Sequence, residues 1–326
     1  MVAGAIAVVP VMSGAAPTPK PTVASVTQQL DALAQESAQL TEKYNVAQVD
    51  LTAKQAAVLA TQQAAAQGET DLTAAVERLR EAVLAQYEQP AFSTTGALLT
   101  SSSGQSYLDT VANLSLIAAN RSDVVAHFVQ ASAASKTAND AAAAAVTAAA
   151  KTRDALQAQK AQVEASITQS QQLLSTLNAA QRRAYQSRNT IADSQSQVTL
   201  VKTVTAHAPP PSIRAGVAVA FALAQVGKPY VYGSGGPNSY DCSGLTAAAW
   251  RAAGVSLPHS AAGQYSYGTH VSVNQLLPGD LMFQYRPIGH VVIYIGNGLA
   301  VSAPQSGENV KVIRVANESW VGATRL

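Results

Sequence analysis

Residues 227–255 read GKPYVYGSGGPNSYDCSGLTAAAWRAAGV, and this stretch decides the fold of the C-terminal part of the chain. Cys242 lies just ahead of the helix-forming run 245–253. A thiol at a helix N-terminus faces unpaired backbone N–H groups and the positive end of the helix dipole, which favours the reactive thiolate. A buried, inert cysteine is the alternative, but the polar, glycine-flanked turn around Cys242 weakens it. The pattern predicts a nucleophile.

A nucleophilic thiol needs a base, and His290 is the candidate among five histidines. It opens the run HVVIYIGNGLAVSAP, in which Asn297-Gly298 joins two apolar, β-branched stretches, a strong hairpin pattern. A histidine at the start of a core strand can be held rigidly against a helix N-terminus. We therefore expect His290 to act as the general base for Cys242.

Upstream of residue 210 the composition changes: residues 1–210 hold 5 of the 20 glycines, and both tryptophans come later. Pro90 ends a first long helical segment, and a second spans about 139–186. Between them, residues 91–136 mix turn-forming and apolar residues, and we expect short helices there, at the tip of an antiparallel hairpin. The heptad-spaced residues predict a coiled coil; they are Val26, Leu30, Leu33, Leu40, Tyr44, Ala47, Leu51, Val58, Leu72 and Leu79.

These patterns predict an α+β protein, in which a long antiparallel helical coiled coil precedes a small domain with a central antiparallel sheet. Residues 1–20 contain a short apolar run and then small residues, which indicates a secretory signal or a disordered segment. Residues 21–205 form the helical domain. Residues 206–212, with three consecutive prolines, form a linker. Residues 213–326 form the C-terminal domain.

Charge and cysteine content exclude several function classes. The formal net charge is +2, with 21 basic and 19 acidic residues, which argues against a general nucleic-acid binder. One cysteine excludes an intramolecular disulfide framework and a multi-thiolate metal site. The histidines show no metal-ligand spacing, and the glycines 233–236 lack the Lys-Ser/Thr pair of a phosphate loop. We expect no cofactor, no metal and no nucleic-acid partner.

Residues 212–326 resemble the NlpC-type cell-wall cysteine peptidases, which have a compact papain-like fold. The likeness rests on five motifs in order: the glycine–tyrosine approach 227–233, Asp-Cys-Ser-Gly at 241–244, Leu-Pro-His-Ser at 257–260, Pro-Gly-Asp-Leu at 278–281 and Gly-His-Val at 289–291. A helical rod joined to such a domain is similar to the Rip-type and PcsB-type peptidoglycan hydrolases.

The resemblance implies roles for individual residues. Cys242 would attack a peptide carbonyl, and His290 would take its proton and later protonate the leaving amine. Tyr230 matches the tyrosine near the oxyanion position. Asp241 and Ser243 match positions that line the substrate cleft, and His259 joins this substrate-binding set. The implied substrate is the D-isoglutamyl–diamino acid bond of peptidoglycan stem peptides, and the implied location is the cell envelope. An FtsX-type membrane protein is the implied activator of a rod that covers the cleft.

The sequence departs from the family pattern at the third catalytic position, where Ser302 replaces a His, Asn, Gln or Glu. An odd-numbered hairpin loop centred on Gly296 would place Ser302 opposite His290, whereas a strict two-residue loop would pair His290 with Gln305. Loss of the orienting group can lower the rate by orders of magnitude. A weakly active or inactive peptidoglycan-binding scaffold is therefore the alternative function. An amidase or acyltransferase acting on another wall amide is a third.

Overall fold

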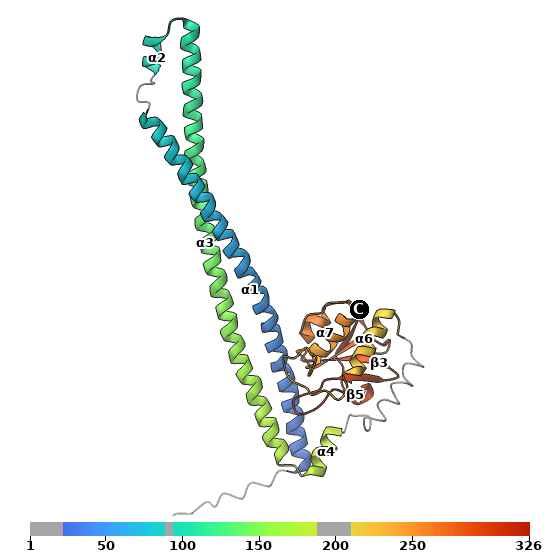
Figure 1. The fold of residues 1–326 in the computed structure, drawn as a ribbon. Helices are drawn as coiled ribbons and strands as arrows, with labels where there is room; N and C mark the ends of the chain where they lie inside the picture. The colour runs from blue at the N-terminus through green and yellow to red at the C-terminus, as the bar shows by residue number, and fades with distance from the viewer. Residues whose placement is uncertain (1–21, 89–93, 188–209) are drawn as a thin grey trace, which may run out of the picture. The chain divides into compact units, whose positions relative to one another are not determined.

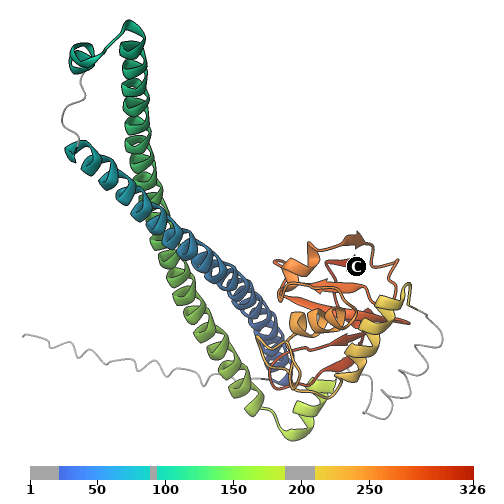
Figure 2. The same ribbon diagram turned by 45° about the horizontal axis from the view of Figure 1, so that its top comes forward.

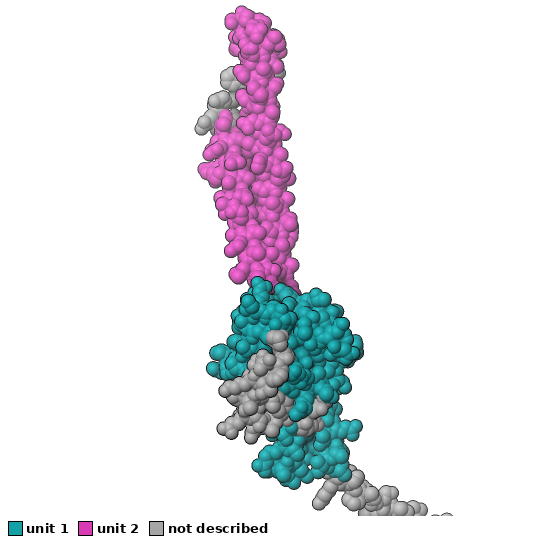
Figure 3. Space-filling view, turned by 90° about the vertical axis from the view of Figure 1, so that its right-hand side faces the viewer, with its two compact units in different colours: residues 1–41, 163–257, 264–326 teal, residues 42–162, 258–263 magenta. Residues whose placement is uncertain are grey.

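The computed structural model describes residues 22–88, 94–187 and 210–326. These residues gather in two compact units (Figure 3): unit 1 contains the described residues within 22–41, 163–257 and 264–326, and unit 2 contains those within 42–162 and 258–263. Unit 1 thus combines the C-terminal domain with the first turns and the last turns of the long helices. The predicted segment 1–20 and residues 206–209 of the predicted linker lie outside the described residues.

Two long helices dominate the first half of the chain. Helix α1 spans Val23–Glu88 and helix α3 spans Gly104–Ser175, and they lie side by side in opposite directions (Figure 1). With 66 and 72 residues, each is about 100 Å long at about 1.5 Å per residue. The prediction of two long helices is confirmed.

The expectation of several short helices over 91–136 was wrong. Only α2 (Thr94–Thr100) is short among the described residues of that range, because α3 already begins at Gly104. The Ser103 hydroxyl caps α3 by accepting from the Ser106 N–H at 3.1 Å. Inside α3, the hydroxyls of Thr110 and Ser115 donate to carbonyls four residues earlier. These residues suggested turns, but their polar groups are satisfied within the helix.

Small residues let the two helices of unit 2 approach closely. A side chain at Gly68 of α1 would place its Cβ 3.1 Å from the Cα of Ser135 in α3, so glycine favours this close approach. Lys54 of α1 also donates to the Thr152 hydroxyl of α3 at 2.7 Å. A close backbone approach at Gly68 and a side-chain hydrogen bond at Lys54 thus both join the helices in unit 2.

The C-terminal domain is built on a six-stranded antiparallel sheet in the order β1-β6-β2-β3-β4-β5 (Figure 2). The strand bounds are β1 Thr269–Val271, β2 Leu281–Gln284, β3 His290–Gly296, β4 Leu299–Ser302, β5 Lys311–Arg314 and β6 Gly322–Arg325. The predicted α+β class and the predicted antiparallel sheet are confirmed.

Alternating residues of the strands form the core. On one face, Met282, Val292, Ala300, Ile313 and Ala323 make a buried cluster, because side chains along a strand alternate between the two faces. Helices α6 (Ile213–Ala224) and α7 (Cys242–Ala252) pack on each other, and both contact β3. The described residues also form three short elements, which are helix α4 (Ala179–Ser187), helix α8 (Ala261–Tyr265) and the 3₁₀ turn η1 (Val315–Asn317).

Among the residues that the structure describes, no helix is both long enough and apolar enough to cross a lipid bilayer.

Candidate active site

Cys242 is the first residue of α7, and the turn before it is built around Asp241. The Asp241 carboxylate caps the helix by accepting from the Gly244 N–H at 2.7 Å, and its second oxygen accepts from the Gly233 N–H at 2.8 Å. Asp241 therefore ties the glycine loop to the start of α7. The thiol is 3% exposed and lies where the helix N-terminus favours a negative charge.

His290 is the first residue of β3, and its ring is held by Ser302. Nε2 of His290 lies 3.2 Å from Oγ of Ser302, at the end of the neighbouring strand β4. Gln284 of β2 pairs with His290, and Lys311 of β5 pairs with Ser302. The four residues thus form a row across β2, β3, β4 and β5 at one end of the sheet.

The hairpin register differs from both predicted registers. Ile293 pairs with Val301 and Tyr294 with Ala300, but a bulge shifts the register so that Gly296 pairs with Leu299. Ser302 is therefore not directly opposite His290, and it reaches the imidazole diagonally across the strands. Gln305 does not take this place, because its side-chain amide donates to Glu308 at 2.8 Å.

Burial controls the charge of the imidazole. Desolvation lowers the pKa of His290 from 6.5 to about 4, and the opposing effect of the Asp241 carboxylate is smaller. The imidazole is therefore neutral at neutral pH, which is the form that can accept a proton.

This pKa shift predicts a loss of stability in mild acid. The unfolded chain takes up a proton near pH 6.5, whereas the native state does so only near pH 4. The stabilisation is thus complete above pH 6.5 and is lost as the pH falls from 6.5 to about 4, by up to about 1.4 kcal/mol per pH unit. Urea unfolding at several pH values should show it, and His290→Gln should remove this part of the pH dependence. Equal pH profiles for the two chains would contradict the prediction.

Two tyrosines lie close to Cys242. Burial, reinforced by the negative charges of Cys242 and Asp241, raises the pKa of Tyr230 well above its usual value of 10. Burial, together with the charges of Glu318 and Cys242, raises the pKa of Tyr285 to about 12. Both phenols therefore stay neutral and can donate a hydrogen bond. Tyr285 was not predicted from sequence; it has a positive φ of 72°, which is unusual for a residue other than glycine.

The remaining predicted residues lie away from the cavity beside His290. Asp241 and Ser243 are completely buried, and the Ser243 hydroxyl donates to Asp241 at 3.4 Å. They shape the nucleophile turn, and like Cys242 and Tyr230 they are not among the residues that line the cavity. His259 is half-buried in the 258–263 segment and does not line the cavity either.

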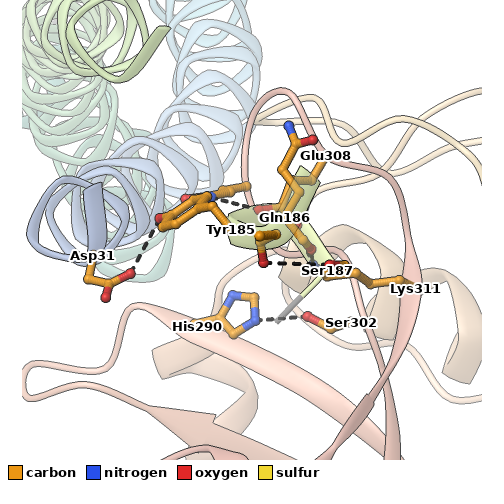
Figure 4. Close-up of polar contacts among 10 residues, drawn as sticks. Asp31, Tyr185, Gln186, Ser187, His290, Ser302, Glu308 and Lys311 are labelled. Atoms are coloured by element: carbon orange, nitrogen blue, oxygen red, sulfur yellow. Dashed lines mark hydrogen bonds and ion pairs between the residues drawn. The ribbon is translucent and has the colours of Figure 1, made fainter. Parts of the chain in front are cut away.

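A polar cavity of about 470 Å³ lies beside His290, and residues from the N-terminal half of the chain cover it (Figure 4). Asp31, Ala34 and Gln35 of α1 line it, as does Tyr185 of α4. Sequence reasoning missed these residues. The only available indication was Tyr185 itself, an aromatic residue in the polar segment 179–187. The rest of the lining comes from the sheet side and consists of Gln284, Tyr285, His290, Ser302, Pro304, Gln305, Glu308, Lys311, Ile313 and Glu318.

Within the described ranges, no group of three or more His, Cys, Asp or Glu side chains is placed to hold a metal ion.

A thiol at the N-terminus of a helix, packed against the strand that carries an oriented histidine, is the arrangement of Cys–His hydrolases as a class. Residues 227–325 match the model of the NlpC/P60 family. This part of the chain is an NlpC/P60 domain, as the sequence motifs predicted.

Named relatives of this domain are endopeptidases. A "Probable endopeptidase" of Mycobacterium tuberculosis is 42% identical over 92 residues, which cover 28% of this chain and 24% of the relative. "Probable endopeptidase p60" of Listeria monocytogenes is 40% identical over 104 residues, which cover 31% of this chain and 21% of the relative. The match thus spans about a quarter of these relatives' length. The solved NlpC/p60 domain of the peptidoglycan hydrolase SagA is 36% identical, covering 34% of this chain and 98% of that chain, with a TM-score of 0.33.

Proposed function

We propose that the protein is an exported peptidoglycan endopeptidase that cleaves stem peptides at the D-isoglutamyl–diamino acid bond with a Cys242–His290 pair. The observation that carries this proposal is the His290–Ser302 contact at 3.2 Å, which orients the imidazole in a domain whose relatives are named endopeptidases. We place the catalytic activity in residues 213–326 and its control in residues 21–205.

The residues support a two-step thiol mechanism. His290 accepts the Cys242 proton, and the thiolate sulfur attacks the scissile carbonyl carbon, forming a C–S bond and an oxyanion. The neutral Tyr230 phenol, whose pKa is raised by burial, donates to that oxyanion in this mechanism. Collapse of the intermediate breaks the C–N bond, and His290 protonates the leaving amine. Water, deprotonated by His290, then hydrolyses the thioester and restores the thiol.

Contacts within unit 1 support control by the rod. Helix α1 passes so close to Gly289, the residue before His290, that a Cβ there would lie 3.1 Å from the Gln39 nitrogen and 3.2 Å from the Ala38 carbonyl carbon. Farther along α1, the side chain of Thr41 acts on the pKa of Tyr230, so it lies next to the oxyanion tyrosine. A helix in this position excludes a peptide from the cleft, so the full-length chain is the inhibited form.

Adding one methyl group at Gly289 should weaken the cover, by which we mean the packing of α1 over the cleft. Gly289→Ala places a methyl group against the α1 backbone, and α1 must move by a few tenths of an ångström to admit it. We expect stem-peptide cleavage by the full chain to rise about fivefold, which corresponds to about 1 kcal/mol lost from the closed state. Gly104→Ala is the matched control, because no atom lies within 4 Å of its added Cβ. An unchanged or lower rate for Gly289→Ala would argue against the cover.

The proposed activity is tested by digesting diaminopimelate-type peptidoglycan with the full chain and with Gly289→Ala, each with and without Cys242→Ala. Mass spectrometry of the products identifies the bond. Fragments that end at D-isoglutamate and vanish in the Cys242→Ala chains support the proposal. A folded Gly289→Ala chain that binds the wall but releases no fragments would instead support the scaffold function. Cleavage of a different wall amide would support an amidase.

For activation we propose an FtsX-type membrane protein that binds unit 2 and draws α1 away. Leu98, Leu99, Leu108 and Leu116 are apolar but strongly exposed on α2 and the first turns of α3, which supports this surface as the binding site. The test compares wall hydrolysis by the wild-type chain and by the double variant Leu98→Asp/Leu99→Asp, each with and without such a membrane protein. Stimulation of the wild-type chain alone would support this binding site. Equal stimulation of the double variant would exclude this surface.

A further inference from the structure

Helix α4 is a short element with a well-formed start and little core of its own. Asn178 and Gln181 exchange two hydrogen bonds at 2.9 Å, each side chain accepting from the backbone N–H of the other residue, which is the capping-box arrangement. Of the nine residues of α4, only Tyr185 is buried. An element with so few buried apolar contacts can open without unfolding the rest of the protein.

Tyr185 attaches α4 to the base of the long helices. Its ring packs in an apolar cluster with Val26, Leu30 and Leu177, and its hydroxyl donates to Oδ1 of Asp31 at 3.3 Å. The same ring lines the cavity that contains His290. One side chain therefore both joins α4 to α1 and closes part of the space beside the catalytic histidine (Figure 4).

The next residue attaches α4 to the sheet. The Gln186 carbonyl accepts a hydrogen bond from Nζ of Lys311 at 3.1 Å, and Lys311 also forms an ion pair with Glu308. The side chains of Lys311 and Glu308 are only 15% and 10% exposed, so this pair is well shielded from water. Lys311 is the β5 partner of Ser302, which holds His290. The anchor of α4 is thus one strand away from the residue that orients the imidazole.

We propose that residues 178–187 form a strap that links α1 to β5 and holds the His290 end of the cleft closed. The strap rests on the proposed function for its biological purpose, but its geometry stands apart from the bond that is cut. Because Tyr185 contacts α1 and Gln186 contacts β5, α1 and β5 can separate only when at least one of these two attachments parts. The strap then adds to the cover that α1 provides and sets how readily the cleft opens.

The test measures access to the site in the full-length chain. Cys242 is the only cysteine, so its alkylation by iodoacetamide reports access without any assumption about substrate. Carbethoxylation of His290 by diethyl pyrocarbonate, mapped by mass spectrometry, reports the cavity directly. The variants are Tyr185→Phe, which removes one hydrogen bond, and Tyr185→Ala, which also removes the ring. Arg182→Ala, on the exposed side of α4, is the control.

Removing the hydroxyl should raise both modification rates about fivefold, and removing the ring should raise them further. Asp31→Asn should act like Tyr185→Phe, and the double variant should show no larger effect than either single one. Midpoints of urea unfolding separate opening of the strap from loss of global stability. The strap is overturned if Tyr185→Ala remains folded and both rates stay at the wild-type value.

Peptidoglycan digestion separates the strap from the proposed function. Faster modification together with faster cleavage supports both. Faster modification without cleavage supports the strap and counts against the peptidase. Cleavage by the wild-type chain, with modification rates unaffected by Tyr185→Ala, retains the peptidase and removes the strap.

Discussion

Replacing His290 with alanine is expected to lower the rate of stem-peptide cleavage by about three to four orders of magnitude, as loss of the base does in other Cys–His and Ser–His sites. In the proposed mechanism the imidazole takes the thiol proton and returns it to the leaving amine, and its position is set by β3 and Ser302. The rate should be measured on soluble stem peptides in the Gly289→Ala background, so that substrate access does not limit it.

Two matched variants test which residue orients the imidazole of His290. Ser302→Ala removes one neutral hydrogen bond from the imidazole and should lower the rate about tenfold. Gln305→Ala should have a smaller effect, because the amide of Gln305 is bonded to Glu308. A larger loss from Gln305→Ala than from Ser302→Ala would show that the register in solution differs. A rate for His290→Ala within tenfold of the parent would remove His290 as the base.

Asp241→Ala is expected to be the most destabilising single change in the nucleophile turn. Asp241 is completely buried and accepts from the N–H groups of Gly233 and Gly244 and from the Ser243 hydroxyl. Truncation removes the helix cap and leaves donors without their acceptor, so the free energy of unfolding should fall by about 3–5 kcal/mol.

Asp241→Asn is the matched control for that prediction. Asparagine keeps one acceptor for Gly244, but its amide would face the Gly233 N–H, donor against donor. We expect a loss of about half that of Asp241→Ala, measured by urea unfolding at pH 7. If Asp241→Ala shifts the unfolding free energy by less than about 0.5 kcal/mol, as surface substitutions do, the turn does not depend on this carboxylate.

Sequence patterns predicted the structure correctly where a feature depends on residues that are close together in the sequence. The placement of Cys242 at a helix start follows from Asp-Cys-Ser-Gly, because an aspartate before a helical run is a strong N-cap. The hairpin followed from Asn297-Gly298, and Asn297 adopts the expected positive φ of 53°. Its register did not follow, because a bulge between Tyr294 and Gly296 shifts the pairing by one residue, and the turn residues do not specify that bulge.

Segments with ambiguous composition were where sequence reasoning failed. Gly104, Ser106 and Ser115 lie in a stretch that resembles turns, yet it is part of α3. The hydroxyl groups of Ser106 and Ser115 can bond either within a helix or within a turn, and the Ser115 hydroxyl donates to the Val111 carbonyl inside α3.

By itself, the sequence determined the α+β class, the two long helices, the antiparallel sheet and the positions of Cys242 and His290 in their elements. These depend on periodicity, caps and turns, which involve residues a few positions apart. Only the tertiary structure decided that Asp31 and Tyr185 reach the His290 cavity and that Lys311 anchors α4. These contacts join residues more than a hundred positions apart, and a helical stripe specifies that a face is buried without specifying what buries it.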